Sequence, residues 1–321
     1  MFILGLNGSP RKKGNTRFLL SSFLKEAEDS GAVTDIINVA EKNIAPCSGC
    51  GACDKNGLCI IDDDMTREIY SLLAQADIII AATPIYFYSA TAQFKALIDR
   101  TQALWNRQYK LRIKHPGAGS RQGFLLALGA TKGKNLFQGI ELTAKYFFDA
   151  VGADFMGCLT YRHIEAPGDM AKHSTVLNDV KKEAKRLLTP LINRKKILFI
   201  CRENACRSQI AAAFTEYFAG DKIEAISGGS KPADDINPVM VEVMREKGID
   251  VEFRKPKSIP EAVSGGRPNL LITMGCEDEC SLIPGVPVQE WNLPDPANRS
   301  DDFMRNVRDE IEKRVIELTG S

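Results

Sequence analysis

The sequence has almost no net charge, few histidines and no long apolar run. Its 42 Lys and Arg residues are balanced by 41 Asp and Glu residues. Because no segment concentrates positive charge, a nucleic-acid partner is not expected. No apolar run reaches the roughly 18 residues of a membrane-spanning helix, and the first residues carry neither a basic region nor a signal-cleavage site. We therefore expect a cytoplasmic protein without a membrane partner.

Nor do the nine cysteines resemble a disulfide framework. All except Cys158 fall into short groups, and in a reducing compartment such groups usually indicate metal binding or catalysis. Cys158 lies in an expected strand and is predicted to be buried and unreactive. The three histidines lie in expected loops or on a surface helix, which favours solvated over catalytic positions: His115, His163 and His173.

Short apolar runs alternate with helical patterns along the chain, which is typical of parallel sheets covered by helices on both faces. At 321 residues two hydrophobic cores are expected, because single cores usually stop growing near roughly 250 residues. A short polar segment, 189–194, separates two such series. The predicted domains are therefore residues 1–190 and 195–321, each with a doubly wound α/β fold, and no internal repeat is found.

The periodicity of the apolar residues locates the elements of each domain. In the first domain, strands are predicted at 2–7, 32–38, 77–82, 122–128 and 154–159, and helices at 16–29, 69–75, 93–104, 139–151 and 175–188. In the second domain, strands are predicted at 196–201, 223–226 and 270–273, and helices at 208–219, 239–247 and 301–319.

The segment 8–16 joins the first predicted strand to the first predicted helix, where free N–H groups and the helix dipole favour an anion. Side chains of four residues are candidates for a phosphate cradle: Ser9, Arg11, Asn15 and Thr16. The segment is neither a Walker loop nor a G-x-G-x-x-G fingerprint. A nucleoside triphosphate or a Rossmann-bound dinucleotide is therefore disfavoured.

Two further loops, 83–89 and 129–133, also follow predicted strands, at the edge where doubly wound sheets bind ligands. Together the three loops could hold a phosphate, a flat ring and the polar rim of that ring. Their residues resemble the family of NADPH-dependent FMN reductases and flavodoxin-like iron–sulfur flavoproteins, over about residues 1–165. The motifs that carry this resemblance are Gly8-Ser9-Pro10, Asn15-Thr16 and Pro84-Ile85-Tyr86.

The resemblance implies a flavodoxin-like fold, bound FMN and reduction of the flavin by NAD(P)H. It also implies a homodimer or homotetramer, with the flavin near the subunit interface. The contacts expected for the flavin, besides the phosphate cradle, are Pro84, Ile85, Tyr86, Phe87 and Gly129.

Four cysteines, Cys47, Cys50, Cys53 and Cys59, fall in one short loop with three glycines. Such close spacing lets thiolates converge on iron, and soft ligands exclude magnesium and calcium. The loop resembles the compact cluster motif of iron–sulfur flavoproteins, which implies a [4Fe-4S] cluster. A zinc site and free thiols are the alternatives.

A second phosphate-type loop runs from Cys201 to Ser208, with Arg207 before the serine and a strand and a helix on either side. The helix N-terminus and Arg207 can hold a tetrahedral oxyanion and favour a thiolate at Cys201 that attacks its central atom. Ser208 can donate a hydrogen bond to that sulfur, and Asn204 is a further candidate for oxyanion binding.

With Asp295-Pro296, this loop resembles the low-molecular-weight tyrosine phosphatase superfamily, over residues 195–321. The resemblance implies that Cys201 is the nucleophile, that Arg207 clamps the oxyanion and that Asp295 is the general acid. Two residues depart from the family pattern. Glu203 stands where a glycine is usual, and Ala297 stands where phosphatases carry a tyrosine.

Cys276 and Cys280 favour the arsenate reductase branch of this superfamily. Thiols four residues apart could exchange disulfides in sequence. The stretch from 273 to 296 resembles thioredoxin-coupled arsenate reductases, in which a second thiol releases arsenite by forming a disulfide and a third carries the disulfide outward. A pair that merely fills the core is the alternative, and Cys206 is expected to be structural or a reserve disulfide partner.

The two resemblances together suggest that NAD(P)H reduces FMN and that electrons then reach the disulfide of Cys276 and Cys280, by way of the four-cysteine loop or directly. The flavin domain would thereby replace thioredoxin. The alternatives are an FMN reductase fused to a protein tyrosine phosphatase, and a flavin and disulfide redox carrier that turns over no oxyanion. The expected small-molecule partners are a nicotinamide nucleotide and either arsenate or a phosphate ester.

Overall fold

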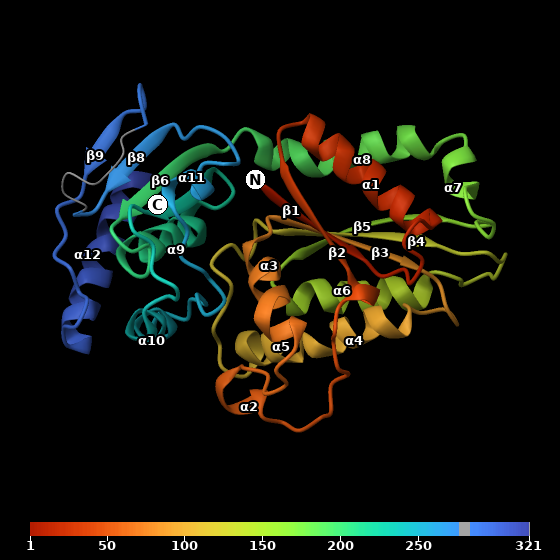
Figure 1. Cartoon of the computed structure of the whole chain (residues 1–321), viewed down its shortest axis with the longest axis horizontal. Helices are drawn as coiled ribbons and strands as arrows, with labels where there is room; N and C mark the ends of the chain where they lie inside the picture. The colour runs from red at the N-terminus through yellow and green to blue at the C-terminus, as the bar shows by residue number, and fades with distance from the viewer. Residues whose placement is uncertain (276–282, 321) are drawn as a thin grey trace. The chain divides into compact units, whose positions relative to one another are not determined.

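The computed structural model describes residues 1–275 and 283–320, which form two compact units (Figure 1). One unit comprises Met1–Arg112 and Gly119–Ile192. The other comprises the residues from Asn193 onward together with Ile113–Ala118. Within this second unit, the backbone of Lys114 pairs with Gly248 and Asp250, through N···O distances of 2.8 Å in both directions.

The described part of the first unit contains a parallel five-stranded sheet with the order β2-β1-β3-β4-β5. Its strands are β1 (Phe2–Asn7), β2 (Val33–Asn38), β3 (Ile78–Pro84), β4 (Gln122–Leu128) and β5 (Asp154–Tyr161). This is the flavodoxin order, in which the chain reverses direction across the sheet between β1 and β3. Every residue of β4 is buried, as expected for a strand covered on both faces. The predicted doubly wound, flavodoxin-like fold is confirmed.

Helices cover both faces of this sheet (Figure 1). On one face lie α1 (Asn15–Asp29), α7 (Asp169–Lys172) and α8 (Val176–Ile192). On the other lie α3 (Tyr70–Gln75), α4 (Ala92–Arg100), α5 (Gln102–Tyr109) and α6 (Gln138–Ala150). Three shorter elements complete the unit: η1 (Val39–Glu41), α2 (Cys53–Asn56) and the π-helix η2 (Met65–Ile69).

Two of the predicted helices of the first unit differ from the observed ones by more than a single residue at an end. The helix predicted at 93–104 is two helices, α4 and α5, separated at Thr101. The carbonyl of Arg100 accepts a 2.6 Å hydrogen bond from the buried Tyr70 hydroxyl at this break. Helix α8 continues through Pro190 to Ile192, so it occupies most of the predicted linker. Burial of Leu188 and Leu191 explains the extension, because ending the helix earlier would expose them.

The described part of the second unit contains a parallel four-stranded sheet with the order β7-β6-β8-β9. Its strands are β6 (Lys195–Cys201), β7 (Ile223–Gly229), β8 (Leu270–Thr273) and β9 (Val288–Glu290). The helices are α9 (Arg207–Ala219), α10 (Pro238–Glu246), α11 (Ile259–Ala262) and α12 (Asp301–Thr319). Strand β9 was not predicted, because its three residues are exposed at the sheet edge and show no apolar alternation.

The core of the second unit forms where α9, α10 and α12 pack on the sheet, around Phe199, Phe214 and Trp291. The order β7-β6-β8-β9 again reverses direction between the first strand in sequence and the third, so the carboxyl ends of β6 and β8 define the ligand-binding edge. Across the described ranges, no helix combines the length and apolar character needed to cross a membrane.

We predict that Gly123→Ala destabilises the first unit. A Cβ built at Gly123 in β4 would lie 2.2 Å from the Phe148 ring, which is packed in the core. Overpacking of this kind typically costs about 1–3 kcal/mol of unfolding free energy, measurable by urea denaturation of the full chain. Gly5→Ala is the control, because its nearest contact, at 2.9 Å, is the flexible end of Leu24. Equal stability of the two variants would contradict the packing argument.

Candidate functional site

The loop after β6 is held in a tight turn by the segment that follows β7. Backbone N–H groups of this segment donate to loop carbonyls: Ser230 to Cys201, Lys231 to Arg202, Ala233 to Glu203 and Asn237 to Ala205, at 2.8–3.3 Å. Gly229, at the end of β7, permits the approach, since a Cβ there would lie 2.8 Å from the Arg202 carbonyl oxygen. The carbonyls of the loop therefore face away from the Cys201 sulfur.

Cys201 is buried at the end of β6, and its sulfur has two hydrogen-bond partners in the part of the chain that the structure describes. The backbone N–H of Asn204 donates to Sγ at 3.2 Å, and the Ser208 hydroxyl lies 3.0 Å from it. Helix α9 begins beside it at Arg207, so the positive end of the helix dipole faces the same region. Hydrogen-bond donors and the positive end of a helix dipole are therefore directed at the sulfur from several sides.

The direction of the hydrogen bond from Ser208 follows from Asn204. The Lys257 backbone N–H can only donate, and it lies 2.8 Å from Asn204 Oδ1, which fixes the orientation of the amide. Asn204 Nδ2 then donates to Ser208 Oγ at 2.8 Å, so the serine proton is free to point at Cys201. Asn204 adopts a left-handed backbone with φ of 51°, which asparagine tolerates better than most residues.

Arg207 is buried and brings the loop into contact with Asp295. Its guanidinium donates to the Leu293 carbonyl at 3.1 Å and lies 3.1 Å from Asp295 Oδ2. The Asp295 side chain is 57% exposed, so solvent reaches its carboxylate. The structure thus brings together Cys201, Asn204, Arg207, Ser208 and Asp295 at the carboxyl edge of the second sheet.

The remaining cysteines of the second unit differ in their accessibility. Burial strongly raises the pKa of Cys206, whose thiol donates to Met304 Sδ at 3.2 Å, so this thiol is poorly suited to disulfide exchange. Cys276 and Cys280 lie outside the described residues. Glu203, the departure inside the loop, is exposed and has an ordinary negative φ, so it fits the turn without backbone strain.

In the first unit, the loops after β1 and β3 meet at the edge where the strand order reverses. The Thr91 hydroxyl caps α4 and donates to the Gly8 carbonyl at 2.6 Å, which ties the two loops together. Ser9 and Thr16 are buried, and Ser9 Oγ accepts the Arg11 backbone N–H at 3.2 Å. The Arg11 side chain is exposed at the mouth of this loop.

Asn15 binds protein groups through most of its amide. Its Nδ2 donates to the Ala166 carbonyl at 2.9 Å, and its Oδ1 accepts the N–H groups of Gly168 and Met170 at 3.1 and 3.2 Å. These bonds anchor the loop after β5 to the first turn of α1. One N–H of the amide is left for a phosphate, so Asn15 mainly positions the loop.

The loop after β3 presents exposed aromatic side chains. Tyr86, Phe87 and Tyr88 are all exposed, and Phe87 and Tyr88 have φ values of 49° and 64°. Positive φ values on aromatic residues are strained and concentrate at functional sites. Pro84 and Ile85 are half-buried behind them.

The loop after β4 packs against these aromatic residues. A Cβ at Gly133 would lie 2.5 Å from the Tyr88 hydroxyl, so the two loops are in close contact. Gly129 is needed for a similar reason, because a Cβ there would lie 2.4 Å from Leu136. All three predicted ligand loops of the first unit therefore lie at one edge of the sheet.

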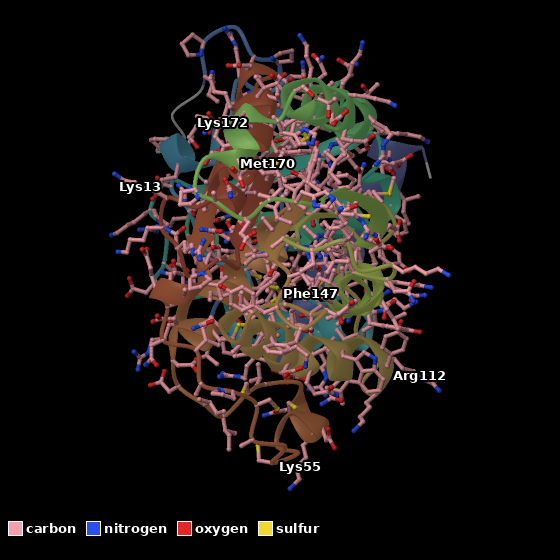
Figure 2. The ribbon with its side chains drawn as sticks, turned by 90° about the vertical axis from the view of Figure 1, so that its right-hand side faces the viewer. Lys13, Lys55, Arg112, Phe147, Met170 and Lys172 are labelled. Atoms are coloured by element: carbon pink, nitrogen blue, oxygen red, sulfur yellow. The ribbon has the colours of Figure 1, made fainter. Side chains whose placement is uncertain are left out.

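The four-cysteine loop projects from the face covered by α5, and Lys55 of α2 points outward near its tip (Figures 1 and 2). Cys47 and Cys50 are exposed, and Cys53 and Cys59 are half-buried. The N–H groups near Cys50 and the Ser48 side chain lower the pKa of Cys50, whereas burial raises that of Cys53.

Within residues 1–275 and 283–320, no three Cys, His, Asp or Glu side chains are arranged to hold a metal ion. The four thiols of the loop nevertheless suit a soft metal or an iron–sulfur cluster. Glycines at 49, 51 and 57 adopt a left-handed backbone that lets the loop turn tightly. The predicted ligands are thus present in one loop but are not brought to a common centre.

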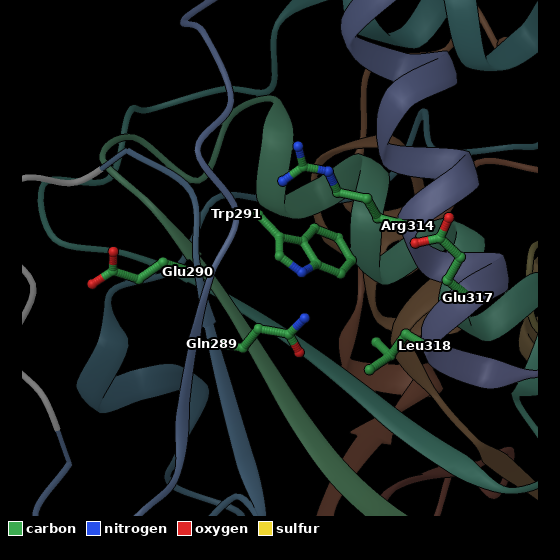
Figure 3. A pocket seen from close by; sticks show the side chains of 6 residues that line it. All are labelled: Gln289, Glu290, Trp291, Arg314, Glu317 and Leu318. Carbon is green, nitrogen blue, oxygen red and sulfur yellow. The ribbon is translucent and has the colours of Figure 1, made fainter.

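A separate hollow of about 480 Å³ lies beside β9 and the end of α12 (Figure 3). Its lining includes Trp291, over which the Arg314 guanidinium lies at 5.9 Å from the ring centroid. Arg314 also donates to Glu310 at 2.7 Å. None of the residues around Cys201 lines this hollow, so it is not the oxyanion site.

The two halves of the chain match two family models. Residues 1–131 match the NADPH-dependent FMN reductase family, and residues 196–321 match the low molecular weight phosphotyrosine protein phosphatase family. The first part of the chain is similar to the FMN reductase family over those residues, and the second part belongs with the arsenate reductases, whose relatives it covers over nearly their whole length. The predicted resemblances and the prediction of an enzyme are therefore confirmed.

Named relatives divide in the same way. An iron–sulfur flavoprotein of Methanosarcina thermophila is 41% identical over 127 residues, which is 38% of this chain and 66% of the relative. Arsenate reductase 2 of Staphylococcus haemolyticus is 33% identical over 128 residues, which is 39% of this chain and 95% of the relative. The thioredoxin-dependent arsenate reductase structure from Corynebacterium glutamicum is 32% identical, covers 46% of this chain and 74% of that one, and has a TM-score of 0.34.

The chain spans 45–66% of the length of these flavoprotein relatives. An FMN reductase-like domain is thus joined to a domain of the arsenate reductase and phosphatase type.

We predict that Asn204→Ala destabilises the second unit by about 3 kcal/mol or more, because it combines left-handed strain with the loss of buried hydrogen bonds. Asn298→Ala is the control. Asn298 also has a positive φ, 57°, but it is exposed, so its replacement should cost only about 1 kcal/mol. Urea unfolding followed by Trp291 fluorescence, in a Trp105→Phe background, measures both values. Equal costs would contradict a special role for the Asn204 amide.

Proposed function

We propose that the chain is a cytoplasmic NAD(P)H- and flavin-dependent oxidoreductase that reduces arsenate to arsenite through thiols. The observation that carries the proposal is the buried Cys201 sulfur, with donors from Asn204 and Ser208, beside an Arg207 guanidinium that contacts Asp295. In this proposal residues 1–190 carry the flavin chemistry, and residues 195–321 carry the oxyanion chemistry. A homodimer or homotetramer is proposed as the assembly.

In the first step, Arg207 and the loop N–H groups hold arsenate while the Cys201 thiolate attacks arsenic. An S–As bond forms and an As–O bond breaks, and the departing oxygen leaves as water after protonation by Asp295. Ser208 and Asn204 favour the thiolate and keep it oriented toward the anion. The exposed Asp295 carboxyl can regain its proton from solvent.

In the second step, the Cys276 thiolate attacks the Cys201 sulfur. An S–S bond forms, the S–As bond breaks, and its electron pair remains on arsenic, which leaves as arsenite. Cys280 then attacks Cys276, so that the disulfide lies between Cys276 and Cys280 and the Cys201 thiol is regenerated. Over a full cycle, one arsenate, one NAD(P)H and one proton give one arsenite, one NAD(P)⁺ and one water.

The first unit offers residues for FMN. Ser9, Arg11 and Thr16 would hold the phosphate at the N-terminus of α1, with Asn15 mainly positioning the loop. The flat ring would lie against the segment from Pro84 to Phe87 and the backbone of Gly129. A bound flavin supplies a hydride acceptor for NAD(P)H, and an iron–sulfur cluster held by the four cysteines would supply one-electron transfer.

A phosphotyrosine phosphatase is the second candidate. It is favoured by the contact between Arg207 and Asp295, which serves phosphate ester hydrolysis equally well. Ala297 weighs against it, because a tyrosine is usual there in phosphatases. Rapid turnover of an aryl phosphate that survives replacement of both Cys276 and Cys280 by serine would support this alternative.

We predict that Cys201→Ser lowers anaerobic arsenite formation, with NADPH as the sole electron donor, by a factor on the order of 10³ or more. Cys206→Ala is the matched control in the same loop and should retain most of the activity, because that buried thiol packs against the core and donates to Met304 instead of facing the Cys201 sulfur. Strict dependence of the wild-type chain on added thioredoxin would contradict the role given to the flavin domain.

We predict that Arg11→Ala weakens FMN binding by roughly tenfold, since a charge-assisted hydrogen bond is worth about 1.5–3 kcal/mol and some of this is screened at an exposed site. Binding of riboflavin, which lacks the phosphate, should not change. Lys12→Ala is the control, because Lys12 already pairs with Glu41 at 2.9 Å. Fluorescence titration gives both affinities. An equal loss of affinity for FMN and for riboflavin would show that Arg11 does not bind the phosphate.

A further inference from the structure

Helices α4 and α5 lie beneath the four-cysteine loop and supply buried hydrogen-bond donors to it, although neither helix carries one of the four cysteines. Helix α4 ends at Arg100, and α5 carries Asn106 and Arg107. All three side chains are buried although each is polar or charged. Burying such groups is unfavourable unless they are paired, so their partners identify what they do.

Arg100 joins the two ends of the cysteine loop. Its Nη1 donates to the Ala45 carbonyl at 2.9 Å, just before Cys47, and its Nη2 donates to the Ile61 carbonyl at 3.2 Å, just after Cys59. Both nitrogens also bind the Asp63 carboxylate, at 2.6 and 3.2 Å. Asp63 in turn accepts the Ala45 N–H at 2.9 Å. A single buried ion pair therefore fixes both ends of the loop.

The ion pair with Asp63 and the two carbonyl bonds do not use every N–H group of Arg100. Arg100 Nε is buried and has no hydrogen-bond partner among the described residues. An unsatisfied buried donor is rare in proteins and suggests a missing acceptor. Burial acts to lower the pKa of Arg100, but the hydrogen bonds to Asp63 raise it overall, so the guanidinium stays charged beneath the loop.

Asn106 donates directly to a cysteine. The side chain is fully buried, and Nδ2 lies 3.1 Å from Cys53 Sγ and 2.9 Å from Asp54 Oδ1. Its Oδ1 accepts a hydrogen bond from Gln102 at 3.3 Å, which is consistent with the nitrogen facing the sulfur. Asn106 thus offers a fixed N–H to one of the four thiols.

Arg107 shows how closely the loop is seated on α5. Its guanidinium donates to the Asn56 carbonyl at 3.2 Å. Gly57 has a φ of 72°, and a Cβ there would lie 2.3 Å from the Arg107 side chain. The loop therefore has little freedom to shift over the two helices at this point.

We propose that Asn106 and Arg100 are positioning residues of the four-cysteine loop. Arg100 fixes the two ends of the loop, and Asn106 orients Cys53 toward a bound metal and sets the reduction potential of an iron–sulfur centre held there. The presence of iron in this inference rests on the proposed function. The positioning of a metal by these residues does not depend on that function. Hydrogen bonds to ligand sulfurs draw charge from them and stabilise the reduced state. Removing the Asn106 donor should make the potential more negative.

The test uses Asn106→Leu in the full chain, reconstituted anaerobically with iron and sulfide. We expect a more negative midpoint potential in a titration followed by electron paramagnetic resonance. We also expect metal retention against a chelator to fall by roughly tenfold to a hundredfold. The control is Gln102→Leu on the same helix, which removes the bond to the Asn106 oxygen and leaves the N–H on Cys53 intact.

Asn106→Asp is a second variant, which keeps the size of the side chain if leucine prevents folding. It replaces the donor with an acceptor, so its potential should shift in the same direction or further. Circular dichroism and flavin content establish whether each variant is folded.

The outcomes separate the two proposals. Iron binding with the same potential and metal retention in wild type and both folded variants overturns this inference and leaves the proposed function intact. If the chain takes up zinc but not iron, the proposal of an iron–sulfur cluster is wrong. The role of Asn106 is then tested by comparing zinc retention in the wild type and the variants. A wild-type chain that binds neither metal overturns this inference, whereas arsenite formation with NADPH still tests the proposed function.

Discussion

The hydrogen bond from the Lys257 backbone to the Asn204 amide oxygen is the constraint on which the oxyanion site depends. It determines which end of the amide faces Ser208, and hence which way the serine proton points. Without that fixed direction, the hydroxyl could accept as readily as donate at Cys201. A backbone group outside the loop therefore helps to orient the hydroxyl that donates to the proposed nucleophile, without touching the sulfur.

Both units position their candidate sites by the same means, although their chemistry differs. In each, loops meet where the order of parallel strands reverses, and a glycine or a side-chain cap brings two loops into contact. The second unit adds a buried arginine and a carboxyl group to this frame. The first unit adds exposed aromatic rings, which suit a flat ligand more than a compact anion.

The sequence predicted both sheets and the loops at their edges, because apolar runs and glycines are local signals. It missed β9, whose residues are exposed, and the break at Thr101, which coincides with a contact from the distant Tyr70. Asn15 was predicted to bind the phosphate, but most of its amide already binds backbone groups of residues 166–170. One N–H group is left for a phosphate. The proximity of Cys201, Arg207 and Asp295 was predicted from two short motifs and a family resemblance, and the structure brings these residues together, whereas the support from Asn106 spans about fifty residues and leaves no local pattern.

The seating of the cysteine segment on α4 and α5 has a consequence for protein engineering. Grafting the segment from residue 47 to residue 59 onto another scaffold would transfer the thiols and glycines but leave their supporting arginines and asparagine behind. The Gly57 backbone is shaped to an arginine that the recipient would lack. A graft that keeps the geometry of the site would have to include α4 and α5 together with the cysteine segment.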